Sequence, residues 1–249
     1  MTAPMFEPPW TAADAVIDTL KRDGQAVLAP ESLGVLGTSA AELDALRPCW
    51  EELPPDGYLK DGGRYRFRRH GNFVVDGDQV RAMPHRAHWQ PLDYNALHGG
   101  IQRWFVPLQA EMNESPAFLA LLAGLGRVCS ALRGYQPWFV EAHPFRIDTT
   151  DGIGRPTPEG AHRDGVDLVA VLLVGREGIK GGESRVFDAQ GPGGQRFTLT
   201  RPWTTLLLDD TRVIHETTPI QPLTPGERGC RDTLVITLRS GGFQGPAAI

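Results

Sequence analysis

Cysteine is scarce in this sequence. Only three of the 249 residues are cysteine, and Cys49, Cys129 and Cys230 lie far apart in the chain. An odd number of widely spaced cysteines, with no Cys-x-x-Cys pair, argues against a disulfide framework and against a cysteine-held metal site. This usage fits a reducing compartment, and we expect a cytoplasmic protein.

Long apolar runs and stretches of one charge sign are also missing. No run approaches the roughly 20 apolar residues that cross a bilayer, and Met1–Trp10 has no basic region followed by an apolar core. The net charge is −5, with acidic and basic residues mixed along the chain. We therefore expect a small-molecule substrate and neither a membrane nor a nucleic acid as partner; the oligomeric state stays open.

Two nucleotide-binding motifs are incomplete. Gly152 and Gly154 begin a glycine-rich loop, but Thr157 occupies the third glycine position of a dinucleotide-binding loop. The His-Arg-Asp string at 162–164 also fails as a kinase catalytic loop, because Val169 stands where that loop needs asparagine. These failures leave the His-Arg-Asp string free for another chemistry.

The patterning predicts a mainly β protein with flanking helices. Ser115-Pro116 and Gly134 bracket a helix with a broad apolar face, and shorter helices are expected after Thr11 and at the capping box of Ser39 and Glu42. Strands separated by Gly and Pro turns follow, which is typical of a jelly roll. The length suits a single domain, 1–249, with a helical and mixed part at 1–134 and most of the jelly-roll core at 135–249.

The most informative residues are His162, Asp164 and His215. In an extended segment His162 and Asp164 point to the same side, and they precede the apolar run 166–174, which reads as a strand buried on both faces. Two histidines and one carboxylate form the triad that binds non-haem iron and leaves coordination sites open. Each residue alone is compatible with a structural role, and His143 is a rival ligand.

The last predicted strand, 231–239, alternates clearly. Leu234, Ile236 and Leu238 share one face, and Arg231 and Thr233 share the other. A guanidinium and a hydroxyl facing a cavity suit a small carboxylate. Arg239, on the same face, is the fallback for Arg231.

The order of these motifs resembles the iron(II)/2-oxoglutarate-dependent dioxygenases, and more narrowly the bacterial family that includes the L-isoleucine 4-hydroxylases. The narrower resemblance extends from about residue 60 to about residue 240. It rests on Tyr65-Arg66-x-Arg68, Tyr94-Asn95 with Gly99-Gly100, His143-x-x-Arg146, Pro158-Glu159-Gly160-x-His162-Arg163-Asp164-Gly165, Gly181-Gly182-Glu183-Ser184 and His215-x-x-x-Pro219-Ile220.

The resemblance implies a double-stranded β-helix, a cupin-like jelly roll, with His162, Asp164 and His215 as ligands of Fe(II). It implies 2-oxoglutarate as co-substrate, with its distal carboxylate on Arg231 and Thr233, and O₂ as oxidant. The implied reaction hydroxylates the side chain of a free L-amino acid, aliphatic by preference, and releases succinate and CO₂.

A free amino acid needs a cation for its carboxylate and an anion or carbonyl for its ammonium group. The candidates are Arg66, Arg68 or Arg146 for the carboxylate, Glu141 or Asp167 for the ammonium group, and Tyr65 with Trp89 as walls. For Arg66 and Arg68 a solvated edge strand is the competing interpretation, and for Arg146 and Glu141 a structural ion pair. His85, His88 and His98 are interpreted as surface or packing residues.

Two other functions stay open. One keeps the iron site and makes the chain a peptide or protein hydroxylase of the JmjC type. The other is a cupin-like metal protein without 2-oxoglutarate chemistry, in which a carboxylate anchor at Arg231 has no purpose.

Overall fold

The computed structural model describes residues 5–94, 97 and 99–246. Asn95 and His98, both noted from the sequence, lie outside these residues. Most strands of the described chain belong to one antiparallel sheet, in which the order is β1-β10-β6-β13-β5-β3-β4 and β2 also pairs with β5. Their bounds are β1 (Gln25–Leu28), β2 (Arg66–Arg68), β3 (Gly71–Asp76), β4 (Gln79–Ala82), β5 (Trp138–Asp148), β6 (Leu168–Glu177), β10 (Thr205–Asp209) and β13 (Cys230–Arg239).

The remaining strands form a smaller layer. β11 (Val213–Thr217), β8 (Ser184–Asp188) and β9 (Gly194–Phe197) make one sheet, and β12 (Ile220–Pro222) pairs with β7 (Ile179–Gly181). Val169 and Leu173 of β6 pack with Val186 of β8 and Val213 of β11, so the two layers share a core. The architecture is a double-stranded β-helix with flanking helices, as the sequence predicted.

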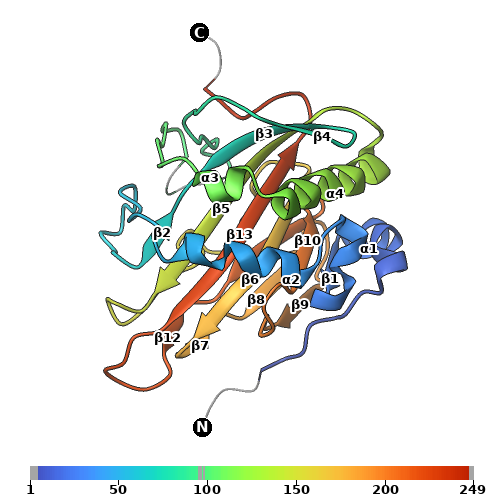
Figure 1. The fold of residues 1–249 in the computed structure, drawn as a ribbon. Helices are drawn as coiled ribbons and strands as arrows, with labels where there is room; N and C mark the ends of the chain where they lie inside the picture. The colour runs from blue at the N-terminus through green and yellow to red at the C-terminus, as the bar shows by residue number, and fades with distance from the viewer. Residues whose placement is uncertain (1–4, 95–96, 98, 247–249) are drawn as a thin grey trace.

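Helices cover the opposite face of the large sheet. The longest, α4 (Pro116–Arg133), begins where the Ser115 hydroxyl accepts a hydrogen bond from the Phe118 amide, and Figure 1 shows it crossing the long strands. The shorter elements are α1 (Val16–Asp23), α2 (Ala40–Leu43), α3 (Ala110–Asn113) and the 3₁₀ segments η1 (Ala13–Ala15), η2 (Pro30–Leu36) and η3 (Asp44–Trp50). The helix predicted to start after Thr11 is present, but Thr11 does not cap it. The Thr11 hydroxyl instead accepts a hydrogen bond from the Val27 amide of β1.

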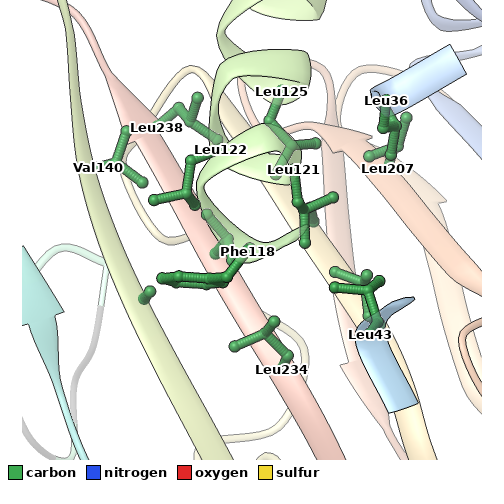
Figure 2. Close-up of a cluster of buried hydrophobic side chains, with 14 of the residues drawn as sticks. Leu36, Leu43, Phe118, Leu121, Leu122, Leu125, Val140, Leu207, Leu234 and Leu238 are labelled. Atoms are coloured by element: carbon green, nitrogen blue, oxygen red, sulfur yellow. The ribbon is translucent and has the colours of Figure 1, made fainter. Parts of the chain in front are cut away.

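The main apolar core lies between α4 and the sheet. Phe118 and Leu122 of α4 point toward Val140 of β5 and Leu234 and Leu238 of β13 (Figure 2), and all five side chains are fully buried. α4 is long and apolar enough to cross a membrane by composition alone, but this packing accounts for its apolar face. One face of β13 is thus committed to the core, which leaves its other face for a cavity.

The first 134 residues are more than a helical cover. They supply β1 beside β10, and β2 and β3 beside β5, so the large sheet is completed by the N-terminal part. Burying the edges of β10 and β5 in this way satisfies backbone groups that would otherwise be exposed. The assignment of the whole chain to one domain stays a prediction.

Candidate active site

A cavity of about 130 Å³ lies between the two layers. The inner faces of β5 and β13 form its wall, and the side chains on these faces alternate with the core residues described above. From β5 the lining residues are Glu141, His143, Phe145 and Ile147, and from β13 they are Arg231, Thr233, Val235 and Thr237. The alternation predicted for the last strand, 231–239, is therefore confirmed, and β5 alternates in the same way.

His162, Asp164 and His215 converge on one point of this cavity. His162 Nε2 lies 3.8 Å from Asp164 Oδ1, and His215 Nε2 lies 3.7 Å from Asp164 Oδ2. Ligand atoms with bonds of roughly 2.1 Å to a shared ion lie at most about 4.2 Å apart, so both distances fit one ion. The three residues could hold a metal, and two imidazoles with one carboxylate suit ferrous iron.

The backbone fixes the two histidines side by side. His162 and His215 exchange two backbone hydrogen bonds, of 3.0 and 2.9 Å, as an antiparallel bridge between the His-Arg-Asp segment and β11. The His162 ring donates from Nδ1 to the Gly160 carbonyl at 2.9 Å, with the tautomer that this acceptor requires. This leaves the Nε2 lone pair directed at the site, as metal-binding histidines need.

Two polar groups orient Asp164. The Gln90 amide donates to Asp164 Oδ1 at 3.0 Å, and Arg103 donates to the Gln90 carbonyl oxygen at 2.7 Å. On the other side the buried carboxylate of Asp210 accepts from the backbone amides of Asp164, Gly165 and Val166, at 3.0, 2.8 and 3.1 Å. Asp210 follows β10, so it ties the metal-binding segment to a neighbouring strand.

The electrostatics of Asp164 and His215 favour a bound cation. Burial raises the pKa of Asp164, and attraction to His162 only partly opposes this shift. Burial, together with repulsion from His162, lowers the pKa of His215 to about 3. His215 is therefore a neutral imidazole at ordinary pH, and the buried Asp164 carboxylate gains from a positive ion beside it.

Arg231 sits on the cavity wall without a partner. It is 3 % exposed, and its Nε and Nη2 atoms are buried with no hydrogen-bond acceptor among the described residues. Burial, with repulsion from Arg176, lowers its pKa to about 10. A buried guanidinium without an acceptor fits an anionic ligand, and Thr233 lines the cavity beside it.

A second part of the cavity wall is basic. Arg66, Arg68 and Arg103 are all buried, and each has a buried guanidinium nitrogen without an acceptor in the described part of the chain. Arg66 donates to Asp56 at 2.8 Å. The Arg68 guanidinium lies 3.8 Å from the centre of the Phe105 ring. This burial excludes the solvated edge strand as the explanation of the basic residues in β2.

One carboxylate, that of Glu141, faces this basic wall. Its Oε1 accepts from His70 Nε2 at 3.0 Å and lies 3.3 Å from His88 Nδ1. Burial opposes ionisation of Glu141, but its interaction with His88 and the hydrogen bonds that His70 and His88 donate outweigh it, and the net pKa shift is downward. Burial lowers the pKa of His88 to about 3, so an ionised glutamate is held by neutral imidazoles.

His143 completes a second group of possible metal ligands with His70, His88 and Glu141. Arg68 donates to its Nδ1 at 2.7 Å, which occupies one lone pair and leaves the proton on Nε2. A neighbouring guanidinium also repels a cation. The triad of His162, Asp164 and His215 is the better metal site, and His143 is better explained as a hydrogen-bonded wall residue.

The structure places four residues predicted to contact the substrate outside the cavity. Tyr65 donates to Asp61 at 2.6 Å and packs in a separate apolar cluster; like Trp89, it does not line the cavity. Arg146 binds Asp232 and Glu51 on the other face of β5, because that strand's alternation separates it from Glu141. Asp167 accepts from the Ser240 amide outside the cavity.

Other predicted residues do line the cavity: Arg66, Arg68, Glu141, Arg231 and Thr233. Their contacts with ligands stay predictions. Sequence reasoning missed the supporting residues Gln90, Arg103, Asp210 and His70, and it interpreted His88 as packing. The irregular stretch at 83–100, which contains His88 and Gln90, was a signal for those two residues alone, since long ordered loops are often functional.

The comparisons agree with this geometry. Residues 47–237 match the family described as 2OG-Fe dioxygenase. No curated protein matches the chain. A crystal structure of a BsmA homologue from Methylobium petroleophilum PM1 is 54% identical, with 97% of this chain and 98% of that chain covered and a TM-score of 0.91.

Two more distant structures show the same fold. The IDO structure from Bacillus thuringiensis has a TM-score of 0.70 at 15% identity, covering 96% of this chain and 100% of that one. The Fe(II)/α-ketoglutarate-dependent dioxygenase TqaL has a TM-score of 0.70 at 22% identity, covering 94% and 90%. Because the family match extends over most of the sequence, this chain belongs to the 2OG-Fe dioxygenase family, whose members use Fe(II), 2-oxoglutarate and O₂.

Proposed function

We propose that this dioxygenase hydroxylates the side chain of a free L-amino acid, with an aliphatic side chain preferred. The observation that supports it is the pairing of a buried cationic wall with the buried carboxylate of Glu141 in the same cavity. Arg66, Arg68 and Arg103 each keep a buried guanidinium nitrogen without an acceptor in the described part of the chain, which suits a substrate carboxylate. Glu141 offers an acceptor for the ammonium group.

In this proposal His162, Asp164 and His215 hold the iron. Arg231 and Thr233 hold the distal carboxylate of 2-oxoglutarate. When bound, iron and 2-oxoglutarate supply the oxidative chemistry in which O₂ yields succinate, CO₂ and the hydroxylated product. The protein holds the His162 tautomer through Gly160 and orients Asp164 through Gln90, and it buries Arg68 and Arg231 away from water.

The apolar part of the wall supports an aliphatic side chain. Phe145, Ile147, Val171, Val166 and Val235 all line the cavity. Apolar groups on a substrate gain by leaving water for such a wall, whereas a charged side chain would need a further partner there.

The same charges disfavour the peptide hydroxylase. A residue inside a peptide has neither a free carboxylate nor an ammonium group, so it would bring no anionic partner to the buried guanidinium groups of Arg66, Arg68 and Arg103. The family match favours 2-oxoglutarate chemistry over the cupin-like alternative.

The test is a screen of free L-amino acids for stimulated succinate release, with their amides and N-acetyl derivatives as paired comparisons. We expect turnover with free aliphatic amino acids and its loss when either charged group is blocked. The proposal is wrong if peptides stimulate succinate release and no free amino acid does.

A matched pair of variants locates the carboxylate anchor. Arg68→Met should raise the Michaelis constant for the amino acid by about 10²- to 10⁴-fold, because one partner of a buried charge pair is lost. Arg146→Met removes an arginine whose carboxylate partners lie outside the cavity and should leave that constant unchanged. Equal effects of both variants would contradict the assignment.

A further inference from the structure

Arg176 lies on β6 directly opposite Arg231 on β13. The register of these strands shifts at this point: Thr233 pairs with Leu173 and Asp232 with Gly175, so the residue between, Val174, has no partner. This is the arrangement of a β-bulge, in which one extra residue changes the direction of the side chains that follow.

The bulge decides which face Arg176 occupies. Leu172 and Val174 of β6 belong to the core under the helices, and strict alternation would place Arg176 on that face too. The extra residue reverses the alternation, so Arg176 shares the inner face of Arg231 and lies next to it, just outside the residues that line the cavity. Bulges near active sites commonly redirect a side chain in this way.

Gly182 confirms that the two side chains are neighbours. A Cβ atom built on it would lie 2.9 Å from Arg176 Nη1 and 3.6 Å from Arg231 Cδ. The residue has a φ of +68°, which also favours glycine. A larger residue here would displace the arginines, so glycine permits their close packing beneath this turn.

Neither guanidinium is neutralised. Arg176 Nη2 donates to the Gly181 carbonyl at 2.7 Å, but its Nη1 is buried without an acceptor in the described chain, as are Nε and Nη2 of Arg231. The nearby Asp232 faces the other side of the sheet, where Arg146 binds it. Arg231 is buried and Arg176 is half-buried, and two cations this close repel each other unless an anion joins them.

We propose that Arg176 supplies a second guanidinium to the 2-oxoglutarate site and, with Arg231, selects 2-oxo acids that carry a distal carboxylate. The inference rests on the co-substrate position proposed above for Arg231. Both arginines donate toward the same carboxylate, which relieves their mutual repulsion. A 2-oxo acid that ends in a methyl group leaves both without an acceptor.

The test is an anaerobic titration of the Fe(II)-loaded protein, followed through the visible band of the bound 2-oxo acid. The ligands are 2-oxoglutarate and 2-oxobutanoate, which lacks the distal carboxylate. Arg176→Gln should weaken 2-oxoglutarate binding by about 10- to 100-fold, the range for a lost hydrogen bond to a charged group. It should change 2-oxobutanoate binding less than about twofold, since that ligand does not use the second guanidinium.

Two further variants complete the design. Arg176→Lys retains the charge and should recover part of the preference for 2-oxoglutarate. Arg127→Gln is the control, because Arg127 forms an exposed ion pair with Asp78. This variant should bind both 2-oxo acids as the wild type does. If Arg176→Gln does not fold, Arg176→Met, which keeps the apolar stem of the side chain, replaces it. The ratio of its affinities for 2-oxoglutarate and 2-oxobutanoate then tests the inference in the same way.

Unchanged 2-oxoglutarate binding in Arg176→Gln would overturn the inference, and so would an equal loss for both ligands. Arg231→Gln separates this failure from failure of the co-substrate placement. If Arg231→Gln alone weakens 2-oxoglutarate binding, the placement stands and Arg176 is not part of it. If neither variant weakens binding, the placement of the co-substrate at Arg231 is itself wrong.

Discussion

The carboxylate of Asp210 positions the metal-binding segment, and replacing it tests that role. Asp210→Asn keeps the shape of the side chain but turns one acceptor oxygen into a donor. In the wild type Oδ2 accepts from the amides of Gly165 and Val166, and Oδ1 accepts from the amide of Asp164. The single amide oxygen of asparagine can accept from the amides of Gly165 and Val166 or from the amide of Asp164, but not from all three. Its NH₂ group then faces a backbone N–H donor and leaves it without an acceptor.

The magnitude follows from these three hydrogen bonds. Losing one bond to a charged acceptor and leaving its buried donor unpaired costs about 2–3 kcal/mol of unfolding free energy. The amide of Asp164 loses its anchor, so the carboxylate that it carries is held less firmly. Mutations of groups that orient metal ligands typically cost about 10- to 100-fold in metal affinity, and we expect a loss in that range.

Two measurements follow the effect. Urea unfolding of the metal-free protein gives the change in stability, and Mn(II) titration by electron paramagnetic resonance gives the change in affinity without turnover. Asp209→Asn is the matched control: the preceding residue is also buried, but its carboxylate accepts from Arg133 and Thr211. It should lose stability and keep its Mn(II) affinity.

The reasoning fails if Asp210→Asn binds Mn(II) as tightly as the wild type. It also fails if Asp209→Asn lowers the Mn(II) affinity by the same factor, because the loss of affinity would then result from general destabilisation of the protein.

Three further predictions concern the ligands, the substrate and pH. His162→Ala, Asp164→Ala and His215→Ala should each abolish succinate formation and metal binding; turnover surviving in one variant would remove that residue from the set of ligands. Glu141→Gln should raise the Michaelis constant of the amino acid and leave the dissociation constant of 2-oxoglutarate unchanged; an effect on both would contradict its assignment to the ammonium group. The pKa of His88 is lowered to about 3, so below its ordinary pKa the unfolded chain binds a proton that the folded protein does not. Urea unfolding should therefore show that the free energy of unfolding falls as the pH is lowered below about 6.5, with this residue contributing up to about 1.4 kcal/mol per pH unit. His88→Gln should make this pH dependence less steep, and an unchanged pH dependence would refute the reasoning.

The sequence by itself determined everything that depends on local periodicity. Alternation placed His162 and Asp164 on one side of an extended segment, and it assigned Leu234 to the core and Arg231 to the cavity. Ser115 and Gly134 bounded the long helix. These features are readable because strand and helix geometry repeat over a few residues, whatever the rest of the chain does.

The same rule, applied consistently, excludes Arg146 from the cavity. The side chains of Arg146 and Glu141 lie on opposite faces of β5, so the two could not both contact one ligand. That error came from residue type, because an arginine suits a substrate carboxylate and a structural ion pair equally well. Only the position of Asp232 on the neighbouring strand decided between them.

Tertiary structure decided the rest. Gln90 reaches Asp164 from an irregular loop, and Asp210 reaches it from the end of β10, through contacts that no local pattern encodes. The bulge at Val174 turned Arg176 inward against the alternation of its own strand. Such contacts depend on how strands pair across long separations, and pairing is fixed by the packing of the whole sheet.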